Sequence, residues 1–472
     1  MTPDEFRKHA HELVEWMAGY MENVGSYPVK SKVTPGSVFN RLPASPPMQP
    51  EPFSAFFDDF NNIIMPGITH WQSPNFFAYF PANSSPPSVL AEMLTATLAS
   101  QCMIWETSPA AAELEERVMN WLRDIIGLPG NFEGVIQDTA STATLAAIIT
   151  AREKATGFVV NENGYSGNPF LRIYCSEQTH SSVDKAVKIA GLGKKSLVKV
   201  GVNADYSMNT EKLALAIEED IKKGYKPCCV IATLGTTSTT AIDPLRAVGE
   251  ICNRHGIWLH VDAALAGTAL VLPEFQWMLD GSEYIDSLVF NPHKWMFTNF
   301  DCTAYFVKDA ATLIRTFEVL PEYLKTRTRG KVNDYRDWGI PLGRRFRALK
   351  LWCVIRMYGV EGIREKIRSH IRLASDLAET IQNEAGFEVL APVPLNTVCF
   401  RYKPAGKDDE TLNSLNEELN HRLNDSGKIY LTHTKLNGIY TLRMVIGQTN
   451  VTGEHVSAAW ELIKDTAAAL KI

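Results

Sequence analysis

The stretch at residues 287–295, SLVFNPHKW, constrains the fold more than any other part of the chain. Its apolar first half predicts a buried strand, and Pro292 then stops further pairing because proline has no N–H for the sheet ladder. His293, Lys294 and Trp295 follow at once. A lysine at a buried strand end is partly removed from water, which favours its neutral, nucleophilic amine. Lys294 could therefore form a Schiff base, or its charged end could simply extend into water.

A second buried-strand pattern, at residues 256–264 (GIWLHVDAA), ends in a carboxylate followed by small residues. Asp262 precedes Lys294 by 32 positions (294 − 262), which leaves room for one more strand–helix excursion. Both side chains could then lie at the carboxyl edge of one sheet, where α/β proteins bind ligands. A lone Asp at a strand end is usually a turn former or a helix cap. An Asp facing a lysine-bound pyridine, however, is the pairing of pyridoxal phosphate (PLP) enzymes.

The two motifs at 260–264 (HVDAA) and 291–295 (NPHKW) together resemble the group II PLP-dependent decarboxylases, above all the aromatic-L-amino-acid decarboxylases. Further motifs of that family follow in the same order at 71–81 (WQSPNFFAYFP), 232–237 (ATLGTT) and 340–347 (IPLGRRFR). Several long motifs in order are far more specific than a single lysine. The resemblance implies α/β fold type I of PLP enzymes, similar to aspartate aminotransferase, whose large domain holds a mostly parallel seven-stranded sheet.

Three segments are predicted, at residues 1–85, 86–358 and 359–472. In the first, apolar residues recur at helical spacing over 4–21 and 53–64, and a proline-rich arm joins the two helices. Two apolar helix faces without a core of their own need a partner, either within the chain or in a second subunit. The resemblance implies the latter: the first segment clasps the twofold-related chain of a homodimer, with active sites at the subunit interface.

The middle segment alternates helices and strands, which predicts the large, mostly parallel α/β domain. The last segment predicts a smaller α+β domain. The predicted strands of the middle segment are 171–175, 196–200, 228–234, 257–261, 286–290 and 302–307, and those of the last are 387–390, 397–402, 429–433 and 440–446.

Composition excludes several function classes. With 45% hydrophobic and 21% charged residues, the 472-residue chain is typical of a soluble globular protein. A net charge of −6 offers no basic surface for nucleic acid or anionic membranes, and no apolar run is long enough to span a bilayer. The acidic N-terminus lacks a signal-peptide core, and the eight cysteines are scattered without a metal-binding or disulfide pattern. We therefore expect a cytoplasmic protein without a metal site.

The phosphate of PLP needs an anion cradle. Residues 134–142 (GVIQDTAST) bring small and hydroxylated side chains to the start of a helix predicted over 143–152. Backbone N–H groups and the positive end of the helix dipole favour an anion there, although such residues alone are more often an ordinary cap. The resemblance places the phosphate on Thr139, Ala140 and Ser141. It implies further cofactor contacts from His180, Thr237, Asp262, Ala264, Asn291, His293 and Lys294.

The resemblance also assigns catalytic roles to Lys294, Asp262, His180 and Tyr323. It implies that Lys294 forms the Schiff base, Asp262 holds the pyridine nitrogen protonated, and His180 stacks on the ring near the substrate carboxylate. Tyr323 opens a polar stretch that predicts a mobile lid, and the resemblance makes it the donor of a proton to Cα after CO2 leaves. Relatives with phenylalanine at that position produce the aldehyde instead, so Tyr323 favours amine formation.

The motif at 71–81 resembles the family's pocket for an aromatic side chain. The predicted pocket residues are Trp71, Tyr79, Phe80, Pro81, Ala82, Gln101, Met103 and Gly343. Ala82, Gln101 and Met103 depart from the threonine, isoleucine and phenylalanine of animal DOPA enzymes, as does Glu106 from alanine, and glycine at 343 leaves room for an indole or a phenol.

The leading interpretation is a carboxy-lyase that converts tryptophan, 5-hydroxytryptophan, DOPA, tyrosine or phenylalanine into an amine. The alternatives are an acidic-amino-acid decarboxylase, an aldehyde synthase, or a binding protein of the same fold that has lost catalysis. An acidic substrate would require a cation in the pocket, and residues 71–81 supply none.

Overall fold

The computed structural model describes residues 1–319, 328 and 330–470. By its internal contacts the chain divides into two compact units. Unit 1 contains Met1–Pro81, Asp376–Leu390 and Cys399–Ile472, and unit 2 contains Ala82–Ser375 and Ala391–Val398. The N-terminal segment is thus grouped with the C-terminal one, and the three-segment division with boundaries after residues 85 and 358 stays a prediction.

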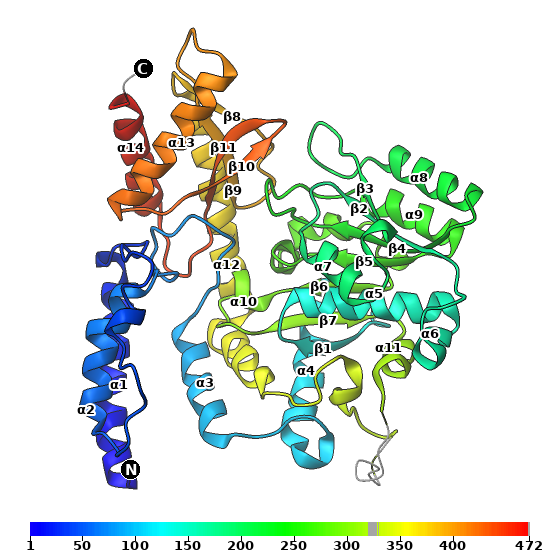
Figure 1. Cartoon of the computed structure of the whole chain (residues 1–472), viewed down its shortest axis with the longest axis horizontal. Helices are drawn as coiled ribbons and strands as arrows, with labels where there is room; N and C mark the ends of the chain where they lie inside the picture. The colour runs from blue at the N-terminus through cyan, green and yellow to red at the C-terminus, as the bar shows by residue number, and fades with distance from the viewer. Residues whose placement is uncertain (320–327, 329, 471–472) are drawn as a thin grey trace. The chain divides into compact units, whose positions relative to one another are not determined.

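Unit 2 is built on a seven-stranded sheet with the strand order β1-β7-β6-β5-β4-β2-β3 (Figure 1). Strand β7 runs antiparallel to both of its neighbours, and the other four pairs are parallel. The predicted fold class, with its mostly parallel seven-stranded sheet, is confirmed. The strands are β1 (Glu133–Gln137), β2 (Leu171–Ser176), β3 (Leu197–Val200), β4 (Lys226–Thr233), β5 (Trp258–Asp262), β6 (Ser287–Phe290) and β7 (Thr303–Val307).

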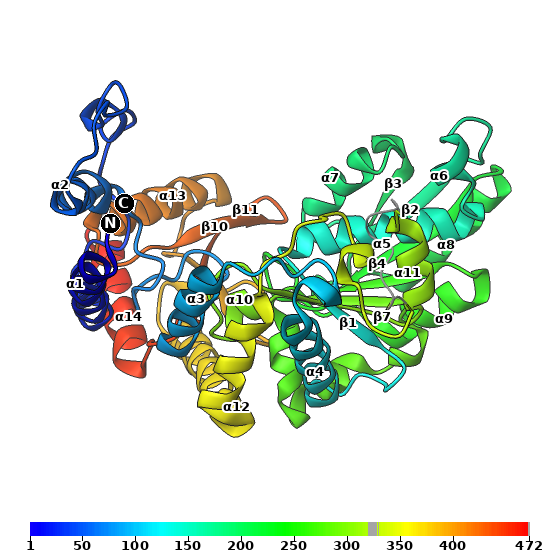
Figure 2. The same cartoon turned by 90° about the horizontal axis from the view of Figure 1, so that it is seen from below.

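Helices cover both faces of this sheet. α5 and α7 pack against one face and α9 packs against the other (Figure 2). A core of buried aliphatic residues from β1, β2, β4, α5 and α7 fills the first of these layers. The helices of unit 2 are α3 (Pro86–Leu98), α4 (Pro109–Ile125), α5 (Ala140–Thr156), α6 (Val159–Asn163), α7 (Ser182–Ile189), α8 (Thr210–Lys222), α9 (Leu245–His255), α10 (Pro292–Trp295) and α11 (Ala310–Phe317), and α12 (Arg347–Asn383) runs on into unit 1.

The six strands predicted for the middle segment all form, but β1 was not predicted. Its sequence, EGVIQ, is short and contains Gly134, and glycine has a low propensity for strands. Packing explains the glycine, since a Cβ there would lie 2.5 Å from Met119 Cε and 2.8 Å from a ring carbon of Phe306. The helix after β1 also begins earlier than the predicted residue 143, at Ala140.

Unit 1 combines two N-terminal helices with a four-stranded sheet of order β10-β11-β9-β8. Trp16 of α1 packs edge-on against Phe60, with ring centroids 5.1 Å apart, just beyond α2. The strand predicted at 429–433 forms three residues later. No helix in the described part of the chain is both long and apolar enough to cross a membrane. The elements are α1 (Pro3–Asn23), α2 (Phe53–Asp59), β8 (Phe387–Val389), β9 (Thr397–Tyr402), α13 (Asp409–Ser426), β10 (Thr432–Leu436), β11 (Ile439–Val445) and α14 (Gly453–Ala468).

Candidate active site

Asp262 and Lys294 lie at the carboxyl edge of the sheet in unit 2. Asp262 is the last residue of β5, and its register partner on the parallel strand β6 is Val289. Asn291 directly follows β6 and is the N-cap of α10. Lys294 lies in the single turn of α10, and the backbone N–H of Lys294 donates to Asn291 O at 2.9 Å. Burial lowers the pKa of Lys294, and the carboxylate of Asp262 acts in the opposite direction. The site therefore holds an amine that is more readily neutral than a surface lysine and is electrostatically coupled to Asp262.

The carboxylate of Asp262 is 5% exposed and only partly satisfied. Its Oδ1 accepts a hydrogen bond from Ala264 N at 3.0 Å, which also fixes the turn after β5. In the described part of the chain, Oδ2 receives no hydrogen bond. A nearly buried carboxylate with a spare oxygen is suited to a protonated ring nitrogen.

His180 follows β2 in the turn before α7. Its Nδ1 accepts from Ser182 N at 3.1 Å and lies 2.9 Å from Ser182 Oγ. Burial and the positive charge of Lys294 lower the pKa of His180, while Asp262 raises it. The imidazole is therefore neutral at neutral pH, and the same two residues that define the sheet edge act on it.

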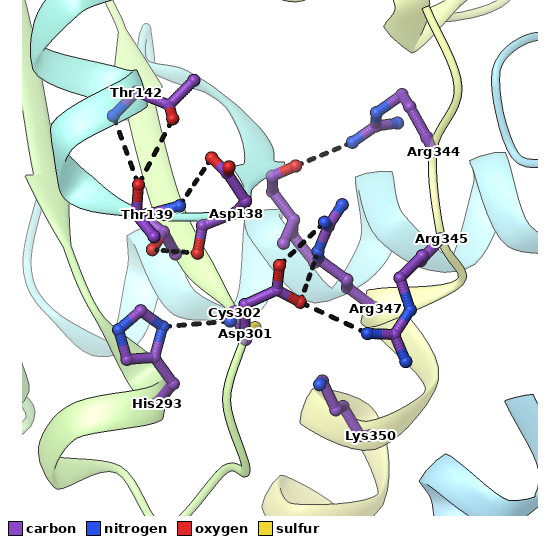
Figure 3. A network of polar contacts seen from close by, with 12 residues as sticks. Asp138, Thr139, Thr142, His293, Asp301, Cys302, Arg344, Arg345, Arg347 and Lys350 are labelled. Atoms are coloured by element: carbon purple, nitrogen blue, oxygen red, sulfur yellow. Dashed lines mark hydrogen bonds and ion pairs between the residues drawn. The ribbon is translucent and has the colours of Figure 1, made fainter. Parts of the chain in front are cut away.

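The helix α5 supplies an anion cradle at this edge. Thr139 is the N-cap, and its Oγ1 accepts from Thr142 N at 3.4 Å (Figure 3). The N–H groups of Ala140 and Ser141 have no acceptor in the described part of the chain. A helix of 17 residues presents these donors together with its positive dipole end.

Asn291 and His293 add two more donors. His293 Nδ1 accepts from Cys302 N at 3.0 Å (Figure 3), and Asn291 Oδ1 lies 2.7 Å from Thr303 Oγ1. Both side chains are buried, and burial lowers the pKa of His293 to about 3. The sequence interpretation did not include Cys302 and Thr303, because their role depends on the antiparallel direction of β7.

The other predicted cofactor contacts belong to turns at the same edge. Thr237 is exposed in the turn after β4, which is closed by a bond of 3.0 Å from Gly235 N to Ala241 O. Ala264 lies in the turn after β5 and is part-buried. Tyr323 lies outside the described residues.

The predicted pocket residues are divided between the units. In unit 1, Trp71 stacks on Phe76 and Tyr79, with ring centroids 4.5 and 5.7 Å apart, and both Trp71 and Tyr79 are exposed. Phe80 lies under the guanidinium of Arg443, 5.7 Å from its ring centroid, and Pro81 is buried.

In unit 2, Gln101 and Gly343 are neighbours. Gln101 Oε1 accepts from Arg344 N at 2.8 Å, and a Cβ on Gly343 would lie 3.2 Å from Gln101 Nε2. Met103 O accepts from Arg336 N at 2.9 Å. Ala82, the first residue of this unit, is part-buried.

Two arginines near the cradle were not predicted as site residues. Arg344 Nη2 donates to Glu115 Oε1 at 2.6 Å and to Ile136 O at 2.8 Å, which ties the end of β1 in place. Arg347 holds the carboxylate of Asp301 with two bonds of 3.0 and 2.9 Å (Figure 3). The only sequence signal for a role of these two arginines near the site is that both belong to the 340–347 motif.

These residues fit PLP. The amine of Lys294 can hold its aldehyde carbon, the free oxygen of Asp262 its ring nitrogen, and the donors around Thr139 its phosphate. A seven-stranded α/β sheet carrying this set at its carboxyl edge defines a PLP-dependent enzyme.

Comparisons with known proteins specify the class further. The model of the pyridoxal-dependent decarboxylase conserved domain matches residues 35–403. The chain belongs to the pyridoxal-dependent decarboxylase family, and it is a carboxy-lyase with PLP as its cofactor.

Relatives match the chain over essentially its whole length. Tyrosine decarboxylase 3 of Petroselinum crispum is 42% identical, and the match covers 100% of this chain and 93% of the relative. The phenylacetaldehyde synthase of Arabidopsis thaliana is also 42% identical, with 100% and 97% covered. The crystal structure of an Oryza sativa TDC with PLP and tryptamine superposes with a TM-score of 0.96 at 37% identity, covering 99% of this chain and 98% of that one.

Proposed function

We propose that this enzyme removes the α-carboxylate of aromatic L-amino acids as CO2 and releases the arylalkylamine. The observation that carries the proposal is the coupling of Lys294 and Asp262 at one sheet edge, beside an anion cradle. The relatives named for tyrosine decarboxylation and phenylacetaldehyde synthesis support an aromatic substrate. The exposed, stacked rings of Trp71 and Tyr79 offer an aromatic side chain a matching surface.

In this proposal Lys294 holds the cofactor covalently, and Thr139, Ala140, Ser141, Asn291 and His293 hold its phosphate. Asp262 keeps a proton on the ring nitrogen, Thr237 and Ala264 contact the ring, and His180 covers its face. When bound, PLP accepts the electron pair that the departing CO2 leaves behind. The positive ring nitrogen, held by Asp262, is what makes that acceptance favourable.

His180 suits a decarboxylase because it is neutral. A cation facing the substrate carboxylate would stabilise the charge that has to disappear as CO2 forms, and would raise the barrier. The lowered pKa of His180 removes this opposing effect, so the imidazole can orient the carboxylate by packing and hydrogen bonding.

Tyr323 donates the proton to Cα and so completes the amine. The names of several relatives, among them phenylacetaldehyde synthases, favour the alternative product, an aldehyde. A phenolic proton donor at position 323, however, directs the reaction to the amine. The residues proposed to contact the substrate are Trp71, Tyr79, Phe80 and Pro81 in unit 1 and Ala82, Gln101, Met103 and Gly343 in unit 2.

The enzyme acts as a homodimer in the cytoplasm, in amine biosynthesis. Helix α1 has no buried residue, and Phe6 and Phe56 are 60% and 59% exposed. Apolar side chains so placed on two neighbouring helices are suited to a second copy of the chain.

A product assay with tryptophan, 5-hydroxytryptophan, DOPA, tyrosine and phenylalanine tests the proposal, with glutamate as the control. We expect one molecule of amine for each CO2 with at least one aromatic substrate, and none with glutamate. Turnover of glutamate alone, or of aldehyde without amine, would contradict it.

A further inference from the structure

The first residues of β7 lie beside the residues that leave β6. The two strands are antiparallel, and Phe290 is the register partner of Ala304. Cys302 and Thr303 therefore reach the carboxyl edge of the sheet, next to Asn291 and His293, although every parallel strand begins at the opposite edge. Cys302, which directly precedes β7, and Thr303, its first residue, each make a hydrogen bond to one of these side chains.

The bond from Cys302 N fixes the tautomer of His293. Because burial lowers the pKa of His293 to about 3, the ring carries a single proton at neutral pH. Nδ1 accepts from Cys302 N at 3.0 Å, so that proton is on Nε2. Nε2 has no acceptor in the described part of the chain, which leaves His293 as a hydrogen-bond donor.

The hydroxyl of Thr303 acts on Asn291 in the same way. It has one proton and two acceptors in reach, Asn291 Oδ1 at 2.7 Å and Asp138 O at 3.0 Å. In the shorter contact Thr303 donates to Oδ1, so Nδ2 faces away from Thr303, and Nδ2 has no acceptor among the described residues. If the amide turned over, Asn291 would present an oxygen instead, which repels an anion.

The direction of this amide matters because a carboxylate lies close to the cradle. Asp138 Oδ1 accepts from Thr139 N at 2.7 Å (Figure 3), at the residue that caps α5. A phosphate dianion bound beside it requires donors that cannot reorient, since each acceptor turned toward it would add to the repulsion from Asp138.

We propose that Thr303 is a positioning residue of the phosphate subsite: its hydroxyl holds the Asn291 amide with the NH2 group toward the phosphate. This inference rests on the proposed assignment of Asn291 and His293 to the phosphate. The Thr303 hydroxyl is directed at Asn291 Oδ1 and Asp138 O, so its effect should depend on the phosphate and not on the ring.

Binding of two ligands to the full-length apoenzyme tests this, with PLP and its phosphate-free analogue pyridoxal followed by absorbance. Thr303→Val keeps the shape but removes the hydroxyl. We expect the Kd of PLP to rise about 10-fold, the size of one lost hydrogen bond, and that of pyridoxal to stay within about twofold. Thr303→Ser should restore PLP binding. Thr268→Val is the matched control, because the buried hydroxyl of Thr268 has no hydrogen-bond partner among the residues that the structure describes, and it should change neither Kd.

The results distinguish the positioning role of Thr303 from the assignment of Asn291 to the phosphate. If Thr303→Val weakens PLP and pyridoxal equally, or weakens neither, the positioning role is wrong. Asn291→Ala tests the assignment underneath: it should also weaken PLP more than pyridoxal. If Asn291→Ala is selective for PLP and Thr303→Val is not, only the inference fails. If Asn291→Ala does not discriminate between the two ligands, the phosphate is bound elsewhere and the proposed assignment fails first.

Discussion

The two edges of the seven-stranded sheet carry similar side chains with different partners. At the amino edge, Lys226 Nζ donates to Ala155 O and Lys308 Nζ to Glu283 O, both at 2.7 Å. Asp286 accepts from Leu259 N at 2.8 Å and lies 4.0 Å from Lys154 Nζ. These residues line a cavity of about 640 Å³, but their hydrogen bonds are made within the fold.

The carboxyl edge leaves groups available. Counting partners among residues 1–319, 328 and 330–470 only, Asp262 has a second oxygen without a donor, Asn291 and His293 have donors without acceptors, and α5 begins with two unbonded N–H groups. A ligand bound at this edge could supply the missing partners and offset the cost of removing these groups from water. The two edges thus differ in the partners of their polar side chains and not in the residue types.

The largest difference between the edges should appear on replacing a lysine. Lys294→Ala removes the amine that we propose to hold the cofactor, and we expect amine production to fall by about 10⁴-fold or more. The mutant should still bind PLP without a covalent bond, through the cradle and Asp262. Lys308→Ala, at the amino edge, should leave turnover within about twofold of wild type. A product assay together with borohydride treatment measures both, and substantial amine from the Lys294→Ala enzyme would refute the covalent role.

Replacing an aspartate should also affect the two edges differently. Asp262→Asn keeps the shape but cannot balance a protonated ring nitrogen, so the barrier should rise by about 3–4 kcal/mol. PLP should remain bound. Asp286→Asn removes a carboxylate whose pKa is raised by burial, and should leave kcat unchanged. Rates measured at saturating substrate, with cofactor content checked by absorbance, distinguish the two; equal rates for Asp262→Asn and wild type would make Asp262 structural.

The sequence alone predicts which edge of the sheet carries Lys294 and Asp262. Lys294 and Asp262 could be placed at one edge because parallel strands share their direction, and each follows an apolar run. Thr303 could not be placed in the same way, since its contact with Asn291 depends on β7 being antiparallel. β1 escaped prediction because Gly134 serves packing against Met119 rather than strand propensity. The polarity and spacing of residues can be read from the sequence, whereas a hydrogen-bond partner that lies on an antiparallel strand is known only from the fold.

The next prediction concerns Tyr323, which lies outside the described part of the chain. If it protonates Cα, Tyr323→Phe should lower amine formation by about 10²-fold. The electron pair left at Cα can then pass to O2, which becomes peroxide, and water then supplies the aldehyde oxygen as ammonia leaves. Aldehyde, ammonia and peroxide should therefore replace the amine as products alongside CO2. Oxygen uptake and product analysis measure the change. Wild-type amine production without peroxide would exclude the role.

Mixed dimers test where Tyr323 acts. Lys294→Ala and Tyr323→Phe chains are each defective, but a mixed dimer has one site with both intact residues if the tyrosine reaches across the subunit interface. Mixing should then restore part of the amine production. No rescue despite demonstrated subunit exchange would mean that Tyr323 serves its own subunit.

The smallest expected effect concerns a buried carboxylate at the end of β4. Asp243 Oδ1 accepts from Met208 N and Oδ2 from Thr233 N, both at 2.7 Å. Burial raises the pKa of Asp243 to about 7, against the lowering effect of these two bonds. Asp243 thus resembles Asp286 at the other edge, which also accepts a backbone N–H and also has a pKa raised by burial.

The sign of the pH dependence follows from this shift. Between a pKa near 4 in the unfolded chain and about 7 in the folded one, the native state binds more protons. The contribution of Asp243 is therefore greatest below pH 4 and is lost as the pH rises through 7, by about 2 kcal/mol between pH 5 and pH 7. Asn cannot titrate, so the free energy of unfolding of wild type minus that of Asp243→Asn should fall across this range. Denaturant unfolding at several pH values measures the difference. A constant difference would mean that Asp243 stays ionised in the fold, and that its two backbone donors outweigh its burial.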